Sequence, residues 1–236
     1  MKSFSIKIAD TAIKITPVYS QIFEMCRDYL TDEEPLFEVE TNEKEFEREK
    51  AMADGEYSLS YLETLAVYRK IVTRLVFSDI LLVHGSAIAV DGKAYLFTAP
   101  SGTGKSTHTR MWREYFKERA VMVNDDKPLV RFKDEGVFIY GTPWNGKHRL
   151  GNNICAPLKG VCILERAKEN SISRISKKEA YPTLLSQIYR PIENGEAMIK
   201  TLQLADKFME LPLYRLGCNI SQDAAITAYE GMKDQL

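Results

Sequence analysis

Residues 99–106 read Ala-Pro-Ser-Gly-Thr-Gly-Lys-Ser, and this stretch decides the fold. It ends as a Walker A phosphate-binding loop does, with Ala99 in place of the first glycine of G-x-x-x-x-G-K-[ST]. Gly102 and Gly104 allow turns in which successive backbone N–H groups point at phosphate oxygens. The pattern therefore predicts a phosphate-binding loop, and a plain glycine turn before a helix is the simpler alternative.

The end of this loop carries the two side chains that such a site needs. Lys105 brings a mobile positive charge to the β- and γ-phosphates of a nucleotide, and the Ser106 hydroxyl can ligate Mg²⁺. The loop follows a β-rich run and precedes an amphipathic helix expected over Thr107–Arg119, which is the placement that the motif requires. This context favours phosphate binding over the simple turn. We expect nucleotide contacts from Ser101, Gly102, Thr103, Gly104, Lys105, Ser106 and Thr107.

Two adjacent carboxylates form a second feature about 20 residues further on. Asp125 and Asp126 follow the β-rich run Val121–Val123, where a strand beside a phosphate loop should present a metal carboxylate. Two neighbouring carboxylates allow a division of labour, in which one holds Mg²⁺ and the other accepts a proton. The sequence leaves open which acid does which, and a polar turn before Lys127 is the alternative interpretation.

The strand that enters the phosphate loop is expected to be half of a β-hairpin. Ala87–Val90 and Ala94–Phe97 are β-rich, and Asp91-Gly92 between them is a strong two-residue turn signal. The loop strand is therefore predicted to be antiparallel to the strand before it, whereas in most P-loop folds a parallel crossover feeds it. His84 stands just before this hairpin.

The order of these features resembles the superfamily of HPr kinase/phosphorylase and phosphoenolpyruvate carboxykinase. The resemblance covers residues 80 to about 165 and is carried by His84-Gly85, the hairpin, the Ser-Gly-Thr-Gly-Lys-Ser loop and Asp125-Asp126. The chain is similar in particular to compact bacterial HPr-kinase-like proteins, through residues 101–112, 124–128 and 141–144.

This resemblance implies an α/β fold with a mixed β-sheet P-loop kinase core of the HPr kinase and phosphoenolpyruvate carboxykinase type. It also implies that His84 lies near the γ-phosphate or the metal, and that Asp125 and Asp126 supply a base and a metal ligand. Without the resemblance, a histidine before a strand is more often structural. We find neither the separate N-terminal domain nor the C-terminal catalytic segment of the HPr kinases, and the carboxykinases are much longer chains. The resemblance therefore implies the shared nucleotide site rather than either specific activity.

A loop expected over residues 141–149 offers further cationic side chains. Lys147 and Arg149 could stabilise a transferring phosphoryl group or hold an anionic acceptor, and we take both as candidate catalytic residues. A solvated surface loop is the alternative interpretation. Arg190, beside a proline at the end of a helix, is a weaker candidate for the same pocket.

The remaining pattern indicates one continuous mixed domain, with residues 1–80 as an α/β elaboration packed on a core of residues 81–236. The charge-dense run Glu40–Lys50 is expected to face solvent, with ion pairs at i,i+3 spacing. The aromatic stripe around Trp112 is expected to pack in the core rather than to stack on a base. Other expected elements are hairpins over 4–15 and 129–140, helices over 21–30, 61–80, 176–189, 196–211 and 224–233, and strands over 36–39, 158–164 and 213–216.

Composition narrows the class of protein. The 236 residues carry 32 lysines and arginines against 33 acids, a balance that argues against a duplex-DNA binder. Apolar stretches fall far below the ~18 residues that span a bilayer. The four cysteines form no C-x-x-C pair, so we expect buried free thiols in a reducing cytoplasm and no zinc site. The expected partners include neither nucleic acid nor membrane, and a homo-oligomer is left open.

These features together predict an ATP- and Mg²⁺-dependent phosphotransferase, with ATP and Mg²⁺ as cofactors. It would move the γ-phosphoryl group to a hydroxyl acceptor, which is either the serine of a small protein or peptide or a small metabolite. The metal ligands would come from Ser106, Asp125 and Asp126. The alternative is a nucleotide-binding switch or regulatory module with little or no phosphotransfer.

Overall fold

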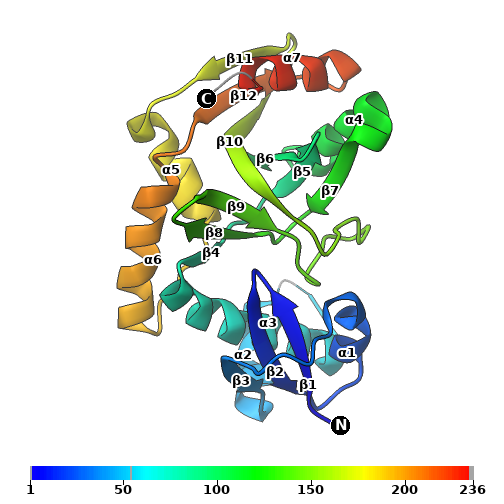
Figure 1. Cartoon of the computed structure of the whole chain (residues 1–236), viewed down its shortest axis with the longest axis vertical. Coiled ribbons are helices and arrows are strands. Elements are labelled where there is room, and N and C mark those ends of the chain that lie inside the picture. Colours follow the sequence, from blue (N-terminus) through cyan, green and yellow to red (C-terminus); the bar gives the residue numbers. More distant parts are fainter. Residues whose placement is uncertain (1, 54, 234–236) are drawn as a thin grey trace.

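The computed structural model describes residues 2–53 and 55–233 and shows an α/β fold with a mixed, curled sheet (Figure 1). The larger sheet follows the order β4-β8-β9-β10-β6-β5-β7, and β12 and β11 extend it beside β10. A separate three-stranded sheet, β1-β2-β3, lies at the N-terminal end of the molecule.

The predicted hairpin before the phosphate loop is present. Strands β5 (Ser86–Val90) and β6 (Lys93–Thr98) are antiparallel, and the turn residues Asp91 and Gly92 have φ of 50° and 76°. These positive φ values are those of the turn that matches strand twist best, which explains the choice of Asp-Gly. Strand β6 leads into the loop and then into α4 (Lys105–Phe116).

Two further strands place the loop strand inside the sheet. Strand β7 (Ala120–Asn124) pairs with the other edge of β5, and β10 (Cys155–Arg166) runs parallel to β6. The first part of β10 pairs with β9 and its later part with β6 and β12, so this single strand joins the two halves of the sheet. The remaining strands of this sheet are β4 (Ile80–Leu82), β8 (Leu129–Lys133), β9 (Gly136–Tyr140), β11 (Ser171–Arg174) and β12 (Leu213–Cys218).

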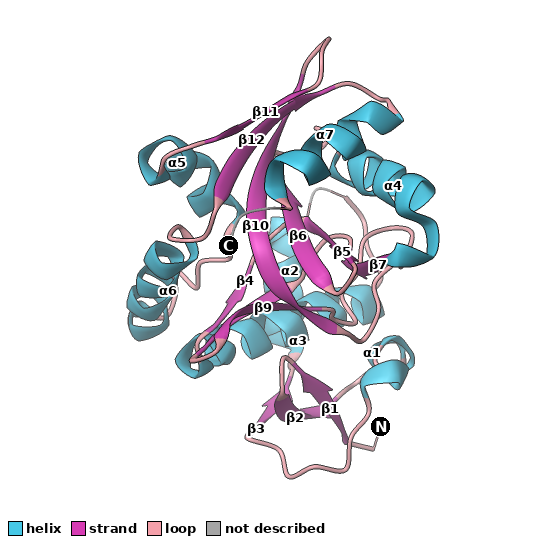
Figure 2. Cartoon of the chain, turned by 45° about the horizontal axis from the view of Figure 1, so that its top comes forward, coloured by secondary structure: helices cyan, strands magenta, loops and turns pink. Residues whose placement is uncertain are grey.

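Helices cover both faces of this sheet (Figure 2). Helices α4 and α7 (Gln222–Met232) share one core, in which Trp112 is fully buried against Phe97. Met111, Trp112 and Phe116 of the aromatic stripe of α4 therefore pack in the core, as expected, whereas Tyr115 is exposed and does not. Helices α5 (Lys177–Gln187) and α6 (Gly195–Phe208) cover the opposite face with a second core. The strand β11 was not expected from the sequence.

The N-terminal region packs against the larger sheet through a third core, which joins Ile13 and Ile71 to Leu129 and Trp144. The elements of this region are β1 (Phe4–Ile8), β2 (Thr11–Thr16), α1 (Gln21–Met25), η1 (Arg27–Tyr29), β3 (Phe37–Glu40), α2 (Glu43–Met52), α3 (Leu59–Leu75) and η2 (Val76–Ser78). A further short 3-10 helix, η3 (Lys117–Arg119), follows α4.

Two helices are shorter than predicted. The helix expected over residues 21–30 breaks at Cys26, and the one expected over 61–80 ends at Leu75.

The charge-dense run confirms its prediction in part, because most of its charged side chains are exposed. It forms α2, but Phe46 and Glu49 are buried, and Glu49 accepts two hydrogen bonds from Arg69 of α3 at 2.6 and 2.9 Å. Lys70 of α3 pairs with Glu45. Acidic side chains of this run therefore hold α2 and α3 together. The predicted i,i+3 pairs lay within the run, whereas the cations that pair with Glu45 and Glu49 belong to α3.

All four cysteines are free thiols, and Cys26 and Cys162 are buried whereas Cys155 is exposed. The expectation of burial is therefore wrong for Cys155, and Cys218 is only partly buried. Within residues 2–53 and 55–233, every helix is too short or too polar to cross a membrane.

Candidate active site

The phosphate loop and the acid pair meet at one cavity of about 460 Å³. Ten of the thirteen residues that the sequence analysis proposed for this site line it, and Thr103, Arg149 and Arg190 do not. The lining comprises His84, Ser101, Gly102, Gly104, Lys105, Ser106, Thr107, Asp125, Asp126, Gly146 and Lys147.

The backbone of the loop depends on its glycines. Gly102 and Gly104 have φ of 77° and 122°, and a Cβ at either position would meet open space, so the requirement is conformational. Ala99 is fully buried and is absent from the positive-φ residues, which explains why alanine is tolerated where the motif has glycine. Thr103 closes the turn by donating from its backbone N–H and its hydroxyl to the Pro100 carbonyl, at 3.3 and 2.8 Å.

Lys105 opens α4 and folds back over the loop. Its Nζ donates to the carbonyl of Ala99 at 2.8 Å, and the side chain is largely buried. Burial lowers the pKa of this ammonium, and the charge of Asp126 acts in the opposite direction. The lysine charge is thus held inside the loop, next to the N-terminus of a helix.

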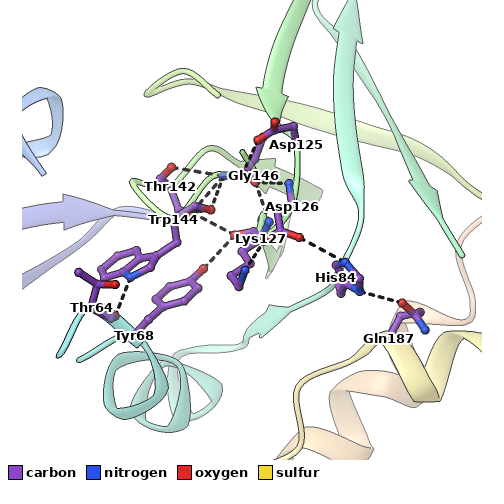
Figure 3. A network of polar contacts seen from close by, with 11 residues as sticks. Thr64, Tyr68, His84, Asp125, Asp126, Lys127, Thr142, Trp144, Gly146 and Gln187 are labelled. Atoms are coloured by element: carbon purple, nitrogen blue, oxygen red, sulfur yellow. Dashed lines mark hydrogen bonds and ion pairs between the residues drawn. The ribbon is translucent and has the colours of Figure 1, made fainter. Parts of the chain in front are cut away.

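Asp126 sits among hydrogen-bond donors (Figure 3). Its Oδ1 lies 3.2 Å from Nε2 of His84, and its Oδ2 accepts from Nζ of Lys127. Burial alone would raise the pKa of Asp126, but the hydrogen bond from His84 and the charge of Lys127 outweigh burial and lower it to about 2. Asp126 is therefore ionised throughout the physiological pH range.

Asp125 has a different environment. Its side chain is buried, and Oδ1 accepts the backbone N–H of Gly146 at 2.7 Å. A Cβ at Gly146 would come within 3.0 Å of Oδ2, so glycine permits this close approach. Asp125 thereby ties the end of β7 to the 141–149 loop.

Asn124, which the sequence analysis did not single out, builds the turn that presents both acids. Its Oδ1 accepts the backbone N–H groups of Asp126 and Lys127 at 2.9 and 2.7 Å. Its Nδ2 donates to the carbonyls of Thr142 and Trp144, both at 3.2 Å. An asparagine directly before the acids was the available signal, since asparagine commonly caps such turns.

His84 is held from its other side by Gln187, at the end of α5. Nδ1 of His84 lies 3.0 Å from Oε1 of Gln187, and the backbone N–H of His84 donates to the Gln187 carbonyl at 2.7 Å. Two arrangements satisfy both side-chain contacts of His84. In one, Nε2 donates to Asp126 and Nδ1 donates to Oε1 of Gln187. In the other, Nε2 donates to Asp126, and Nδ1 accepts from the Gln187 amide after that amide is rotated by 180°. The sequence held no signal for this contact, because 103 residues separate the two positions.

The 141–149 loop is anchored by the N-terminal region. The Trp144 ring stacks on Tyr68 of α3 with 4.0 Å between ring centroids, and its Nε1 donates to the Thr64 carbonyl at 2.8 Å. Lys147 lines the cavity, whereas Arg149 turns back, with φ of 48° and its N–H on the Gly146 carbonyl.

Two expectations for cations therefore differ in the structure. Arg149 does not line the cavity, and its backbone forms a turn in which its N–H donates to the Gly146 carbonyl. Arg190 lines another cavity, between α2, α3 and residues 189–194.

The donors in the cavity fit a magnesium ion bound together with phosphates. Among the described residues no group of three or more His, Cys, Asp or Glu side chains could hold a metal by itself. The cavity offers the Ser106 hydroxyl and the carboxylates of Asp125 and Asp126, all hard oxygen donors. Magnesium is usually bound by one or two carboxylates, with substrate phosphates and waters completing its shell.

No protein-family model matches the chain, and no curated protein has a matching sequence. Among solved structures the chain is similar to the Hpr(Ser) kinase/phosphatase from Coxiella burnetii, with 9% identity and a TM-score of 0.37. The match covers 64% of this chain and 98% of that one. A likeness at this level assigns neither a family nor an activity, so the chemistry has to come from the residues of the site.

Proposed function

We propose that the chain is an ATP- and Mg²⁺-dependent phosphotransferase that moves the γ-phosphoryl group of ATP to a hydroxyl acceptor. The observation that carries this proposal is the shared cavity, in which a glycine loop with a buried lysine meets two carboxylates and a histidine. Phosphoryl transfer is mainly positioning and charge stabilisation, and these residue types supply both. A module that only holds a nucleotide has no need of a histidine aligned on a carboxylate.

The loop suits the phosphates of a nucleotide. The Lys105 ammonium now donates to a carbonyl oxygen of the loop, and phosphate oxygens are stronger acceptors for the same donor. The first residues of α4, Lys105, Ser106 and Thr107, line the same cavity, and the start of a helix offers free N–H groups to an anion. Bound Mg²⁺ would neutralise charge that develops on the phosphate oxygens.

The surroundings of the two acids favour different roles. Donors from His84 and Lys127 already occupy Asp126, and a cation would have to displace or repel them. Within the described part of the chain, Asp125 accepts only a backbone N–H, which leaves Oδ2 for a metal. We therefore assign Asp125 and Ser106 to Mg²⁺ and Asp126 to the hydroxyl of the acceptor.

The low pKa of Asp126 is compatible with this role. In the loose transition state of phosphoryl transfer the attacking hydroxyl needs orientation more than early deprotonation. An ionised Asp126 accepts a hydrogen bond from that hydroxyl, and His84 fixes the carboxylate. Lys147, on the 141–149 loop, supplies positive charge at the same cavity. The acceptor would be a serine of a small protein or peptide, or a small hydroxylated metabolite.

The test is transfer of radioactive phosphate from γ-labelled ATP in the presence of MgCl₂. The full chain is incubated with one pool of serine-containing peptides and one pool of hydroxylated metabolites. The expected result is a labelled acceptor, lost in both Lys105→Ala and Asp126→Asn. Tight Mg²⁺–ATP binding with neither transfer nor ADP release would favour the nucleotide-binding switch, and absence of binding would contradict both functions.

A further inference from the structure

A second cavity, of about 410 Å³, lies where the N-terminal helices meet the chain after α5. It is lined by residues of α2, α3 and the segment 189–194, and by no residue that lines the site described above. Its volume falls within the range of pockets that hold small organic molecules, about 300–1,000 Å³. The proposed phosphotransfer makes no use of it.

The lining carries an excess of positive charge, although the whole chain has a net charge of −1. Five basic and three acidic side chains line it, and each acid already has a basic partner. Glu45 pairs with Lys70, Glu49 with Arg69, and Glu193 with Arg48.

Two arginines of the lining have no acidic partner in the described part of the chain. Arg74 donates to the carbonyl of Glu38 at 2.6 Å and lies over the ring of Phe37. Arg190 is exposed, and no described residue forms a hydrogen bond or ion pair with its side chain. A guanidinium group binds a carboxylate or phosphate through paired N–H donors, so this cavity has donors available for an anion.

The rest of the lining is largely apolar. Met52, Ala66, Pro191 and Ile192 contribute to it, together with the ring of Tyr189. The Arg69 guanidinium lies over the face of that ring, 5.8 Å from its centre, and is held there by Glu49. This contact fixes the position of the ring and covers one of its faces. An aromatic occupant would therefore meet the remaining surface of the ring, against which edge-to-face packing is also favourable.

We propose that this cavity is a binding site for a small organic anion with a planar apolar body and a carboxylate or phosphate group. The apolar body would pack against Tyr189 and Ile192, and the anionic group would reach Arg190. This site is distinct from the proposed nucleotide site and does not depend on it.

Chain connectivity links the cavity to His84. Tyr189 donates its backbone N–H to the Leu82 carbonyl at 3.0 Å, and Gln187, two residues earlier, holds the backbone and ring of His84. An occupant that contacts Tyr189 and Arg190 would restrain this segment. Its binding should therefore slow opening of the hydrogen bonds that hold residues 82–84.

The test uses 2-naphthoate as the probe and the uncharged 2-naphthylmethanol as its matched control. Both are titrated against the full chain without nucleotide by isothermal calorimetry at low salt. We expect the Kd of 2-naphthoate to be at least about tenfold lower than that of 2-naphthylmethanol, because only the carboxylate can form a charge-assisted hydrogen bond with an arginine. We expect Arg190→Ala to remove that difference, Arg190→Lys to keep part of it, and Arg27→Ala, an exposed arginine elsewhere in the N-terminal region, to leave it unchanged.

Hydrogen exchange supplies the second readout. Saturating 2-naphthoate should slow exchange of the backbone N–H groups of His84 and Tyr189 in the wild type, and not in Arg190→Ala. Equal Kd values for the two compounds, or equal naphthoate binding by wild type and Arg190→Ala, would overturn the proposal. Because ATP is absent, these results are independent of whether the chain transfers phosphate.

Discussion

Nε2 of His84 lies 3.2 Å from Oδ1 of Asp126, and this contact joins two segments that are 42 residues apart in the chain. His84 precedes β5 and Asp126 follows β7, and β5 and β7 are neighbours in the sheet. Their pairing brings the end of one strand beside the start of the other. The histidine and the carboxylate can therefore act together at the cavity that the phosphate loop lines.

Replacing Lys105 should remove nucleotide binding. Mg²⁺–ATP at about 100 times its Kd stabilises the native state by about 2.7 kcal/mol, which raises Tm by about 5–10 °C in a chain of this size. Lys105→Ala should lose most of this shift, and its own Tm without ligand should stay near that of the wild type. Differential scanning calorimetry measures both. A wild type with no shift at millimolar Mg²⁺–ATP would contradict the phosphate-loop interpretation.

Replacement of the two aspartates by asparagine should have different effects at Asp125 and at Asp126. Asp126→Asn should lower phosphoryl transfer by about 10²-fold while Mg²⁺–ATP binding stays within a few-fold of wild type. The change replaces one acceptor oxygen by an NH₂ donor and removes the negative charge that attracts the proton of the attacking hydroxyl. Asp125→Asn should instead weaken the dependence of ATP binding on Mg²⁺ concentration. Binding titrations at several magnesium concentrations, with single-turnover assays, separate the two effects. The reverse pattern would exchange their roles.

Gln187 should act as a positioning residue through His84. Gln187→Leu removes the side-chain contact but keeps the backbone bond to His84, so we expect transfer to fall about tenfold with little change in ATP affinity. Gln187→Glu keeps an acceptor for Nδ1 and should retain more activity than Gln187→Leu. Lys178→Ala, an exposed change on the same helix, is the control. Equal activity of Gln187→Leu and wild type would leave Gln187 a purely structural contact.

Lys147 should matter for transfer more than Arg149 does. Lys147 lines the cavity and Arg149 does not, so Lys147→Ala should reduce transfer about tenfold or more at nearly unchanged ATP affinity. Arg149→Ala should have a clearly smaller effect. ATP titration beside single-turnover transfer tests this. Equal losses in both variants would mean that the loop closes onto the nucleotide.

His108 should make the protein less stable in acid. Burial lowers the pKa of His108 to about 3, and its Nε2 accepts a hydrogen bond from Nε1 of Trp112 at 2.9 Å. In the unfolded chain His108 has a pKa near 6.5, so the unfolded state takes up the proton before the folded state does as pH falls. The stability from neutral His108 is therefore present above about pH 6.5 and decreases below it, by about 2 kcal/mol between pH 7 and pH 5.

Urea unfolding at several pH values tests this prediction. His108→Gln keeps a hydrogen-bond acceptor for Trp112 but does not titrate. The difference in unfolding free energy between wild type and His108→Gln should therefore shift against the wild type from pH 7 to pH 5. A difference that is independent of pH would mean that His108 has the same pKa in the folded and unfolded states, which would contradict the prediction.

The sequence by itself determined the local elements around the phosphate loop. Asp91-Gly92 demands a turn with positive φ, and Gly102 and Gly104 supply the backbone conformations of the loop, so these features follow from residues close together in the chain. The predicted hairpins are present for the same reason. The ends of helices were harder to predict. The helices end at Cys26 and Leu75, and no glycine or proline stands at or beside either position.

Only the tertiary structure decided which side chains share a cavity. Gln187 reaches His84 from a helix 103 residues away, and Trp144 is anchored by Tyr68 of the N-terminal region. Lys147 lines the cavity and Arg149 does not, although both stand on the same loop. Such contacts arise from strand order and helix packing, which local periodicity does not encode. The residue types of the site could therefore be predicted from sequence, but their partners, burial and charge balance could not.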